Sequence, residues 1–399
     1  MDSHLLFRIY MKKILFFILI PMLSFGQHSK DNPPKKTTNN SQKNSTNLYQ
    51  QSISKSIEKA TEHNRRSGQN LVNTFKIAFG SCGNQNDELP IFNNVVNHQP
   101  DLFIFMGDNI YGDTKDMSKL KEKYTLLGDK PSYKNLYNNV PIIATWDDHD
   151  YGWNDIGKNY KFKEQSKEIF LDFFKVPEKS SRRIHKGIYG AHYYKTSYIN
   201  IQIILLDERT FRDDLVQYDN EHKEDSRYSF YNQAYKPNID ASVTILGKEQ
   251  WIWLKNELSN PYDVRIICSA TQFGIEWNGY ESWANFPNEQ QKMLDLINET
   301  NAEGIIFISG DVHYSEISKI ETENYPIYDF TSSGLSSTWK FATPNKNRIE
   351  GPVMENNFGL ITLKGDNNKT AISLETWDIN DNQRIEYSFN LKDIGNQSK

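Results

Sequence analysis

The stretch Leu102-Phe103-Ile104-Phe105-Met106-Gly107-Asp108-Asn109-Ile110-Tyr111 joins a run of apolar residues to a glycine and an aspartate. A short apolar run that stops at a glycine is typical of a buried strand ending in a tight turn. The same pattern recurs along the chain. The other runs, each with the residues that follow it, are 75–79 (Gly80-Ser81-Cys82), 140–145 (Trp146-Asp147-Asp148-His149-Asp150), 199–206 (Asp207-Glu208-Arg209), 264–268 (Ser269-Ala270-Thr271) and 305–309 (Gly310-Asp311-Val312-His313). We therefore predict a set of buried strands with polar residues at their carboxyl ends.

Helical periodicity appears between these runs. Apolar residues share one helical face at 162, 169, 170 and 173, at 251, 254 and 258, and at 293, 294 and 297. Alternating strands and helices predict an α/β fold, in which ligands bind beyond the carboxyl ends of the strands. Residues 358–364 and 370–377 flank Gly365-Asp366-Asn367-Asn368, which predicts a hairpin, and residues 384–391 predict a third strand beside it.

The composition limits the function classes. The chain has 399 residues, a formal net charge of -5 and 13% aromatic residues, which suffices for a large core. This acidic balance argues against a nucleic-acid scaffold as a partner.

The N-terminus has the pattern of an export signal. Lys12 and Lys13 precede an apolar stretch over 14–25, and Ser24 and Gly26 supply small residues before a cleavage point. A retained membrane anchor is the alternative, but the apolar stretch is too short to span a bilayer comfortably, so we expect no stable anchor. We predict a signal peptide over 1–26, a polar and largely disordered linker over 27–73, a catalytic domain over 74–392 and a tail over 393–399. The product would be periplasmic or secreted.

The chain has two cysteines, Cys82 and Cys268. An exported protein could join them in a disulfide. We expect instead that Cys268 is a buried strand residue and that Cys82, at a strand end, has a chemical role.

Three acidic clusters at strand ends indicate a site with two metal ions. Such a site needs a carboxylate shared between the ions and further ligands from several rigid strand ends. Asp108 suits the shared position, and the phenol of Tyr111 would suit a hard cation such as Fe(III). Asp147, Asp148 and Asp150 surround His149, and close carboxylates repel one another unless cations neutralise them. Asp311 and His313 lie two residues apart and so face the same way on an extended segment. Ordinary strand-to-turn residues and solvated loops are the alternatives for each cluster taken alone.

These residues carry a resemblance to a known family. The chain resembles the PhoD-like (alkaline phosphatase D) family of the calcineurin-like metallophosphoesterase superfamily, from about residue 75 to about residue 391. The motifs that carry it are Phe79-Gly80-Ser81-Cys82, Met106-Gly107-Asp108-Asn109-Ile110-Tyr111, Trp146-Asp147-Asp148-His149-Asp150, Leu206-Asp207-Glu208-Arg209, Leu246-Gly247-Lys248-Glu249-Gln250-Trp251, Ser309-Gly310-Asp311-Val312-His313 and Ser332-Ser333-Gly334-Leu335.

The resemblance implies a two-sheet β-sandwich flanked by helices and a site that holds Fe(III) and Ca(II). By motif position, the iron ligands would be Cys82, Asp108, Tyr111 and His313. Asp108 would be shared with calcium, whose further ligands would be Asp148 and Asp311, with Asp147 and Asn154 as weaker candidates. Thiolate and phenolate suit iron, and carboxylate oxygens suit calcium.

The predicted catalytic residues are His149, Arg209 and Asp108. The resemblance implies that His149 stabilises or protonates the leaving oxygen, and Arg209 would clamp the phosphate, with a salt bridge to Asp207 or Glu208 as its alternative. Trp277, Tyr280 and Trp283 would line a cleft for an organic group or pack in the core.

We therefore expect an exported phosphoesterase, an alkaline phosphatase or phosphodiesterase that uses a hydroxide shared by two metal ions on a small phosphoester. A strict phosphodiesterase for envelope or extracellular diesters and an inactive metal-bearing binding protein are the alternatives.

Overall fold

The computed structural model describes residues 73–217, 235–366 and 369–395. The predicted signal peptide and nearly all of the predicted linker lie outside the described residues, as do Asn367 and Asn368 of the predicted hairpin turn.

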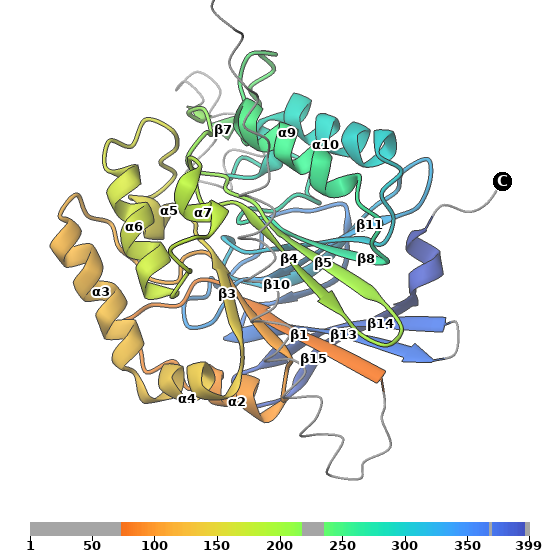
Figure 1. Cartoon of the computed structure of the whole chain (residues 1–399), viewed down its shortest axis with the longest axis horizontal. Helices are drawn as coiled ribbons and strands as arrows, with labels where there is room; N and C mark the ends of the chain where they lie inside the picture. The colour runs from red at the N-terminus through yellow and green to blue at the C-terminus, as the bar shows by residue number, and fades with distance from the viewer. Residues whose placement is uncertain (1–72, 218–234, 367–368, 396–399) are drawn as a thin grey trace, which may run out of the picture. The chain divides into compact units, whose positions relative to one another are not determined.

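The first of two large sheets has six strands in the order β15-β14-β13-β1-β2-β3 (Figure 1). Their bounds are β1 Asn73–Gly80, β2 Leu102–Met106, β3 Ile142–Thr145, β13 Asn357–Asp366, β14 Lys369–Asp378 and β15 Gln383–Asn390. Strands β1, β2 and β3 run parallel, and β13, β14 and β15 extend the sheet antiparallel, with Asp366 paired to Lys369 across the predicted turn.

The second sheet has seven strands in the order β12-β10-β11-β9-β8-β5-β4. Their bounds are β4 Gly190–Lys195, β5 Asn200–Leu205, β8 Val264–Cys268, β9 Ile305–Ser309, β10 Ser315–Ile320, β11 Ile327–Ser332 and β12 Arg348–Val353. Strands β5, β8, β9 and β11 are parallel neighbours, and the edge strands are antiparallel. A separate two-residue pairing joins β6 (Val216–Gln217) to β7 (Tyr235–Lys236).

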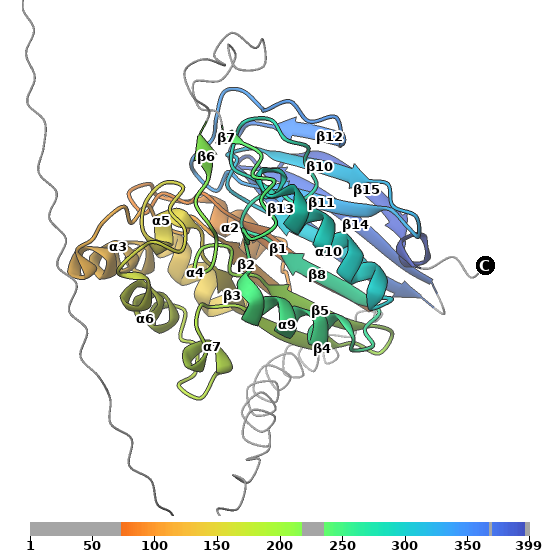
Figure 2. The ribbon, with the colours of Figure 1, turned by 90° about the horizontal axis from the view of Figure 1, so that it is seen from above.

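Helices cover the outer face of each sheet (Figures 1 and 2). The first sheet carries α2 (Ile91–Asn97), α3 (Met117–Asp129), α4 (Pro131–Asn139) and α6 (Lys163–Phe173), and the second carries α9 (Gly247–Leu258) and α10 (Pro287–Glu299). Short helical turns complete the described chain: α5 (Asp148–Tyr151), α7 (Ser181–Ile184), η2 (Trp283–Asn285) and η3 (Leu391–Ile394). The predicted α/β class, with two sheets flanked by helices, is confirmed.

The alternation of side chains in β1 explains these layers. Phe75, Ile77 and Phe79 pack into the core between the sheets, whereas Ala78 packs into the core beneath the helices. Successive side chains of a strand point to opposite faces, so a strand that is apolar at every position is buried on both.

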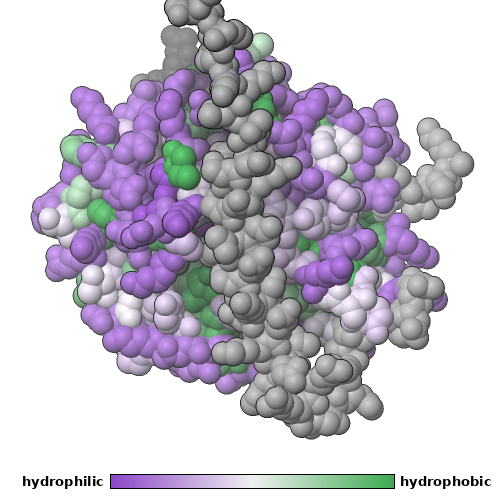
Figure 3. All heavy atoms as spheres, viewed as in Figure 1, coloured by the Kyte–Doolittle hydropathy of each residue, from purple (hydrophilic) through white to green (hydrophobic). Residues whose placement is uncertain are grey.

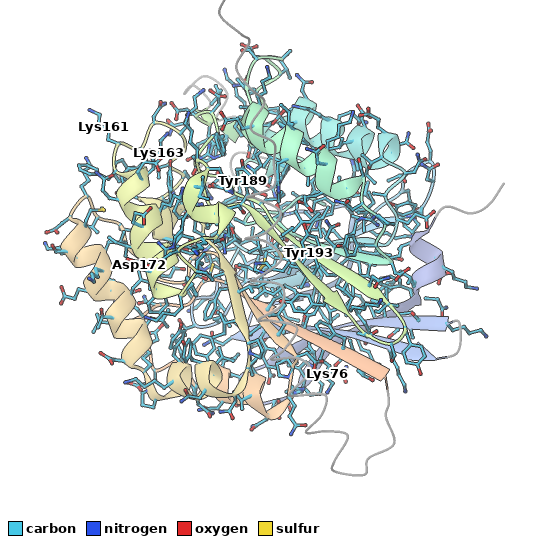
Figure 4. All side chains as sticks on the ribbon, in the orientation of Figure 1. Lys76, Lys161, Lys163, Asp172, Tyr189 and Tyr193 are labelled. Carbon is cyan, nitrogen blue, oxygen red and sulfur yellow. The ribbon has the colours of Figure 1, made fainter. Side chains whose placement is uncertain are left out.

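Most of the surface drawn in colour in Figure 3 is hydrophilic, with smaller hydrophobic areas between the polar side chains. Asp172 of α6, labelled at this surface in Figure 4, lies 2.8 Å from a guanidinium nitrogen of Arg183. Among the described residues, no helix combines the length and the apolar character that crossing a membrane requires.

Candidate active site

The carboxyl ends of β1, β2, β3 and β9 bring the predicted metal ligands together. Ligand atoms of Cys82, Asp108 and His313 lie within 4.8 Å of one another. Two further groups meet the same limit, one of Asp108, Asp147 and Asp311 and one of Asp108, Asp148 and His149. Asp108 belongs to all three groups, which is the arrangement that a shared carboxylate requires.

The backbone adopts an unusual conformation at these same positions. The φ angles are 57° at Cys82, 48° at Asp108, 70° at Asp311 and 60° at His313, all in the left-handed region. Residues with a side chain seldom adopt this conformation, and it occurs most often where surrounding structure enforces a functional geometry. The fold thus holds four predicted ligands in backbone conformations that an unconstrained chain would avoid.

Two glycines let the strand ends approach closely. A Cβ atom at Gly107 would lie 2.5 Å from the Cβ of Asp147, and one at Gly310 would lie 2.5 Å from Oγ of Ser81. Any larger residue at either position would therefore push neighbouring ligand loops apart.

His313 and Cys82 are oriented by the loop after β11. His313 Nδ1 lies 2.9 Å from the carbonyl oxygen of Ser337, and the backbone N–H of His313 donates to Oγ of Ser333 at 2.9 Å. A proton on Nδ1 would leave the Nε2 lone pair for a cation. The same Ser333 Oγ lies 3.1 Å from Sγ of Cys82. Cys82 and Cys268 are both free and buried, and Cys268 lies in β8 as predicted.

Tyr111 is held by a residue that sequence reasoning missed. The backbone N–H of Tyr111 donates to Oε1 of Gln85 at 2.8 Å, and Nε2 of Gln85 donates back to the Tyr111 carbonyl at 3.4 Å. The Tyr111 ring lies 4.5 Å from the ring of His149 and 6.5 Å from that of His313. Gln85 follows Cys82 in a loop without a motif of its own, so the sequence contains no signal for this role.

His149 has a carboxylate partner that was also missed. Nδ1 of His149 lies 2.7 Å from Oδ1 of Asp113, and the backbone N–H of His149 donates to Oδ1 of Asp148 at 2.8 Å. Burial lowers the pKa of His149, but the bond to Asp113 and the charges of Asp148 and Asp147 outweigh it and raise the pKa to about 9. The ring is thus fixed at one nitrogen, which leaves Nε2 to act on a substrate.

Arg209 lies at the site but is fully buried and ion-paired. Its guanidinium contacts Oδ1 of Asp147 at 2.5 Å and Oε1 of Glu281 at 2.7 Å. The alternative of a guanidinium salt bridge to Asp207 or Glu208 is wrong, because the guanidinium pairs with Asp147 and Glu281 instead. From Arg209, Asp207 accepts only the backbone N–H, at 3.0 Å, and Glu208 accepts from Ser269, Thr271 and Trp283. A phosphate clamp at Arg209 stays a prediction.

The weaker candidate Asn154 is exposed in the turn after α5. Its neighbour Asp155 instead forms a fourth acidic group with Asp148 and Glu281, within 4.8 Å of one another. The backbone N–H of Asp155 also donates to Oδ2 of Asp148, which orients that carboxylate. The turn therefore orients Asp148 by means of Asp155. This residue lies one position after Asn154, which the sequence suggested.

The donor set fits metal ions. Burial, followed by the charges of nearby carboxylates, raises the pKa of both Asp108 and Asp311 well above its ordinary value. Oδ1 of Asp108, Oδ2 of Asp147 and the hydroxyl of Tyr111 are buried and have no hydrogen-bond partner among the described residues. Buried carboxylates gathered in this way require compensating positive charge, which bound cations would supply.

The fold and the position of this site define a class. Two sheets flanked by helices, with an acidic and histidine-bearing cluster beyond the parallel strands, make up a metallophosphoesterase-type fold. The solved structure of PhoD superimposes with a TM-score of 0.62 at 15% identity, covering 79% of this chain and 72% of that chain. A likeness at this identity concerns the fold.

The chain belongs to the PhoD-like phosphatase family, whose sequence model matches residues 77–378. A curated relative, alkaline phosphatase D of Bacillus subtilis (strain 168), is 24% identical over 300 residues, which cover 65% of this chain. The chain spans about half of that relative, 48% of its length. The family resemblance drawn from the sequence motifs is confirmed.

Proposed function

We propose that this protein is an exported, metal-dependent phosphoesterase that hydrolyses small phosphoesters, diesters at least as well as monoesters. The single observation that carries the proposal is the position of Asp108, which belongs to three groups of possible metal ligands whose donor atoms lie within 4.8 Å of one another. The family membership supports the same reaction class. The signal-like pattern of residues 11–26 supports export.

We propose Fe(III) and Ca(II) as the two ions. Cys82, Asp108, Tyr111 and His313 would hold iron, and Asp108, Asp148 and Asp311 would hold calcium, because thiolate and phenolate suit the first and carboxylates the second. When bound, the ions would polarise the phosphoryl group and supply an activated water.

The residues around the ions have separate tasks in this proposal. His149, fixed at Nδ1 by Asp113, would place Nε2 against the leaving oxygen and give it a proton. Arg209 would hold Asp147 through their buried ion pair and lower the charge repulsion among the carboxylates.

The proposed iron ligands predict a coloured enzyme. Purified protein should show a visible charge-transfer band, because thiolate and phenolate donate electron density to Fe(III). Tyr111→Phe and Cys82→Ser should each shift or abolish this band. Cys268→Ser is the matched control, since Cys268 is equally buried but lies in β8, and it should leave the spectrum unchanged. An active, colourless enzyme that contains zinc alone would contradict the metal assignment.

The charges at the site predict a preference for diesters. A phosphate monoester dianion carries one more negative charge than a diester and needs more cationic neutralisation. Arg209 and Arg212 are both buried, and both contact the carboxylate of Glu281, at 2.7 and 3.1 Å. Their positive charge is therefore already partly neutralised. We expect kcat/KM for bis(4-nitrophenyl) phosphate to equal or exceed that for 4-nitrophenyl phosphate with calcium present. A monoester preference above about tenfold, or about 1.4 kcal/mol, would contradict this prediction.

The same assay separates the alternatives. Release of nitrophenol from the diester alone supports a strict phosphodiesterase, and release from neither ester by metal-loaded protein supports an inactive metal-bearing protein.

A further inference from the structure

A row of aromatic rings leads away from His313. The ring of Trp339 lies 5.0 Å from that of His313 with 21° between their planes, and the ring of Phe341 lies 5.2 Å from that of Trp339 with 16°. Tyr280, from the loop after β8, lies 5.5 Å from Trp339 and 6.4 Å from Phe341. We call Tyr280, Trp339 and Phe341 the aromatic wall.

Both segments of the aromatic wall are anchored to the site. The backbone N–H of Trp339 donates to the carbonyl oxygen of His313 at 3.1 Å. Tyr280 directly precedes Glu281, whose carboxylate forms the buried ion pair with Arg209. The rings therefore keep a fixed position relative to the proposed metal ligands and do not depend on a free loop.

The aromatic wall is partly exposed to solvent. Phe341 is 41% exposed, and Tyr280 and Trp339 are half-buried. Phe273 and Trp283, in contrast, are fully buried in the core between the sheets and the helices. Of the two alternatives left open for Trp283, the structure shows core packing, whereas Tyr280 lies beside the site. Stacked rings that stay partly exposed next to a site offer a ligand apolar area and flat faces.

A phosphodiester has two ester groups, of which one leaves and the other, the retained arm, stays bonded to phosphorus. We infer that the aromatic wall binds the retained arm, and that this arm carries a planar unsaturated ring. The inference rests on the proposed phosphoesterase function. In the proposed function the leaving oxygen would face His149, so an arm that runs past His313 toward Trp339 and Phe341 would be the retained one. Stacking against Phe341 would hold the ring while the ester is positioned at Asp108.

Two substrates that differ only in the retained arm test the inference. 4-Nitrophenyl phenyl phosphate and 4-nitrophenyl ethyl phosphate have the same charge and leaving group, so both are followed by nitrophenolate release. We expect the wild type to prefer the phenyl diester in kcat/KM by about fivefold, the size of an aromatic stacking contact. Phe341→Ala and Tyr280→Ala should each lower this ratio toward one, whereas Phe341→Tyr should retain it.

The matched control is Tyr137→Ala. Tyr137 is 50% exposed and stacks on Tyr133, but it lies in α4, a helix that packs on the first sheet. Its replacement should leave the ratio at the wild-type value. Provided that the diesters are hydrolysed, two results would overturn the inference. One is a ratio near one in the wild type, and the other is a ratio that stays at the wild-type value in both alanine variants. Failure of the metal-loaded wild type to hydrolyse either diester would instead defeat the proposed function.

Discussion

Asp108→Ala is expected to lower kcat/KM for bis(4-nitrophenyl) phosphate by at least about 10³-fold, or about 4 kcal/mol of transition-state stabilisation. The physical reason is that Asp108 belongs to three groups of possible metal ligands, whose donor atoms lie within 4.8 Å of one another. In the proposed function Asp108 is a ligand of both iron and calcium, so one substitution removes a ligand from each ion. Metal analysis of the purified variant should show both ions depleted. Asp108→Asn keeps one oxygen donor and should retain part of the metal while losing most of the rate.

Asp101→Ala is the matched control for Asp108→Ala. Asp101 directly precedes β2, at the opposite end of the strand from Asp108, and accepts the backbone N–H of Lys76 at 2.8 Å. This variant should keep the metal content and the rate of the wild type. Turnover near the wild-type level in Asp108→Ala, with metal retained, would show that the catalytic centre lies elsewhere.

His149→Ala is expected to have its largest effect on esters with poor leaving groups. A general acid typically contributes about 10²–10⁴-fold, and a nitrophenolate leaves with little help from a proton donor. We therefore expect a loss in that range for a diester with an alkyl leaving group and a much smaller loss for bis(4-nitrophenyl) phosphate. Asp113→Asn should show the same dependence on the leaving group with a smaller loss, because it disturbs the orientation of His149 and leaves the ring in place.

A second histidine–aspartate pair supplies the control for His149→Ala. Nε2 of His98 lies 2.7 Å from Oδ1 of Asp381, the same separation as in the pair of His149 and Asp113. His98 follows α2, and its ring packs at a tilt against Trp377 of the first sheet. His98→Ala should leave both substrates unaffected. Equal losses on both ester types in His149→Ala would assign His149 a structural role.

Strands that are buried on both faces could be predicted well from sequence. Strands β2, β8 and β9 begin and end at the residues predicted, because an uninterrupted apolar run has few alternatives to a central strand. Strand β10 was not predicted, because its buried positions include Ser315, Glu316 and Ser318. Glu316 is stabilised there by the charge of Arg348 and by hydrogen bonds from Gln272 and Asn345, and these partners come from other segments of the chain.

The sequence by itself determined the α/β class, the family and the residues that carry the proposed chemistry. This was possible because a carboxylate or histidine directly after a buried strand must emerge at the edge of the sheet. The tertiary structure decided which of these residues meet and what holds them. Asp113 pairs with His149 across 36 residues, and Glu281 pairs with Arg209 across 72. No local pattern encodes such pairs, because a charged side chain in a loop looks the same in sequence whether it is solvated or buried against a partner that only folding brings near.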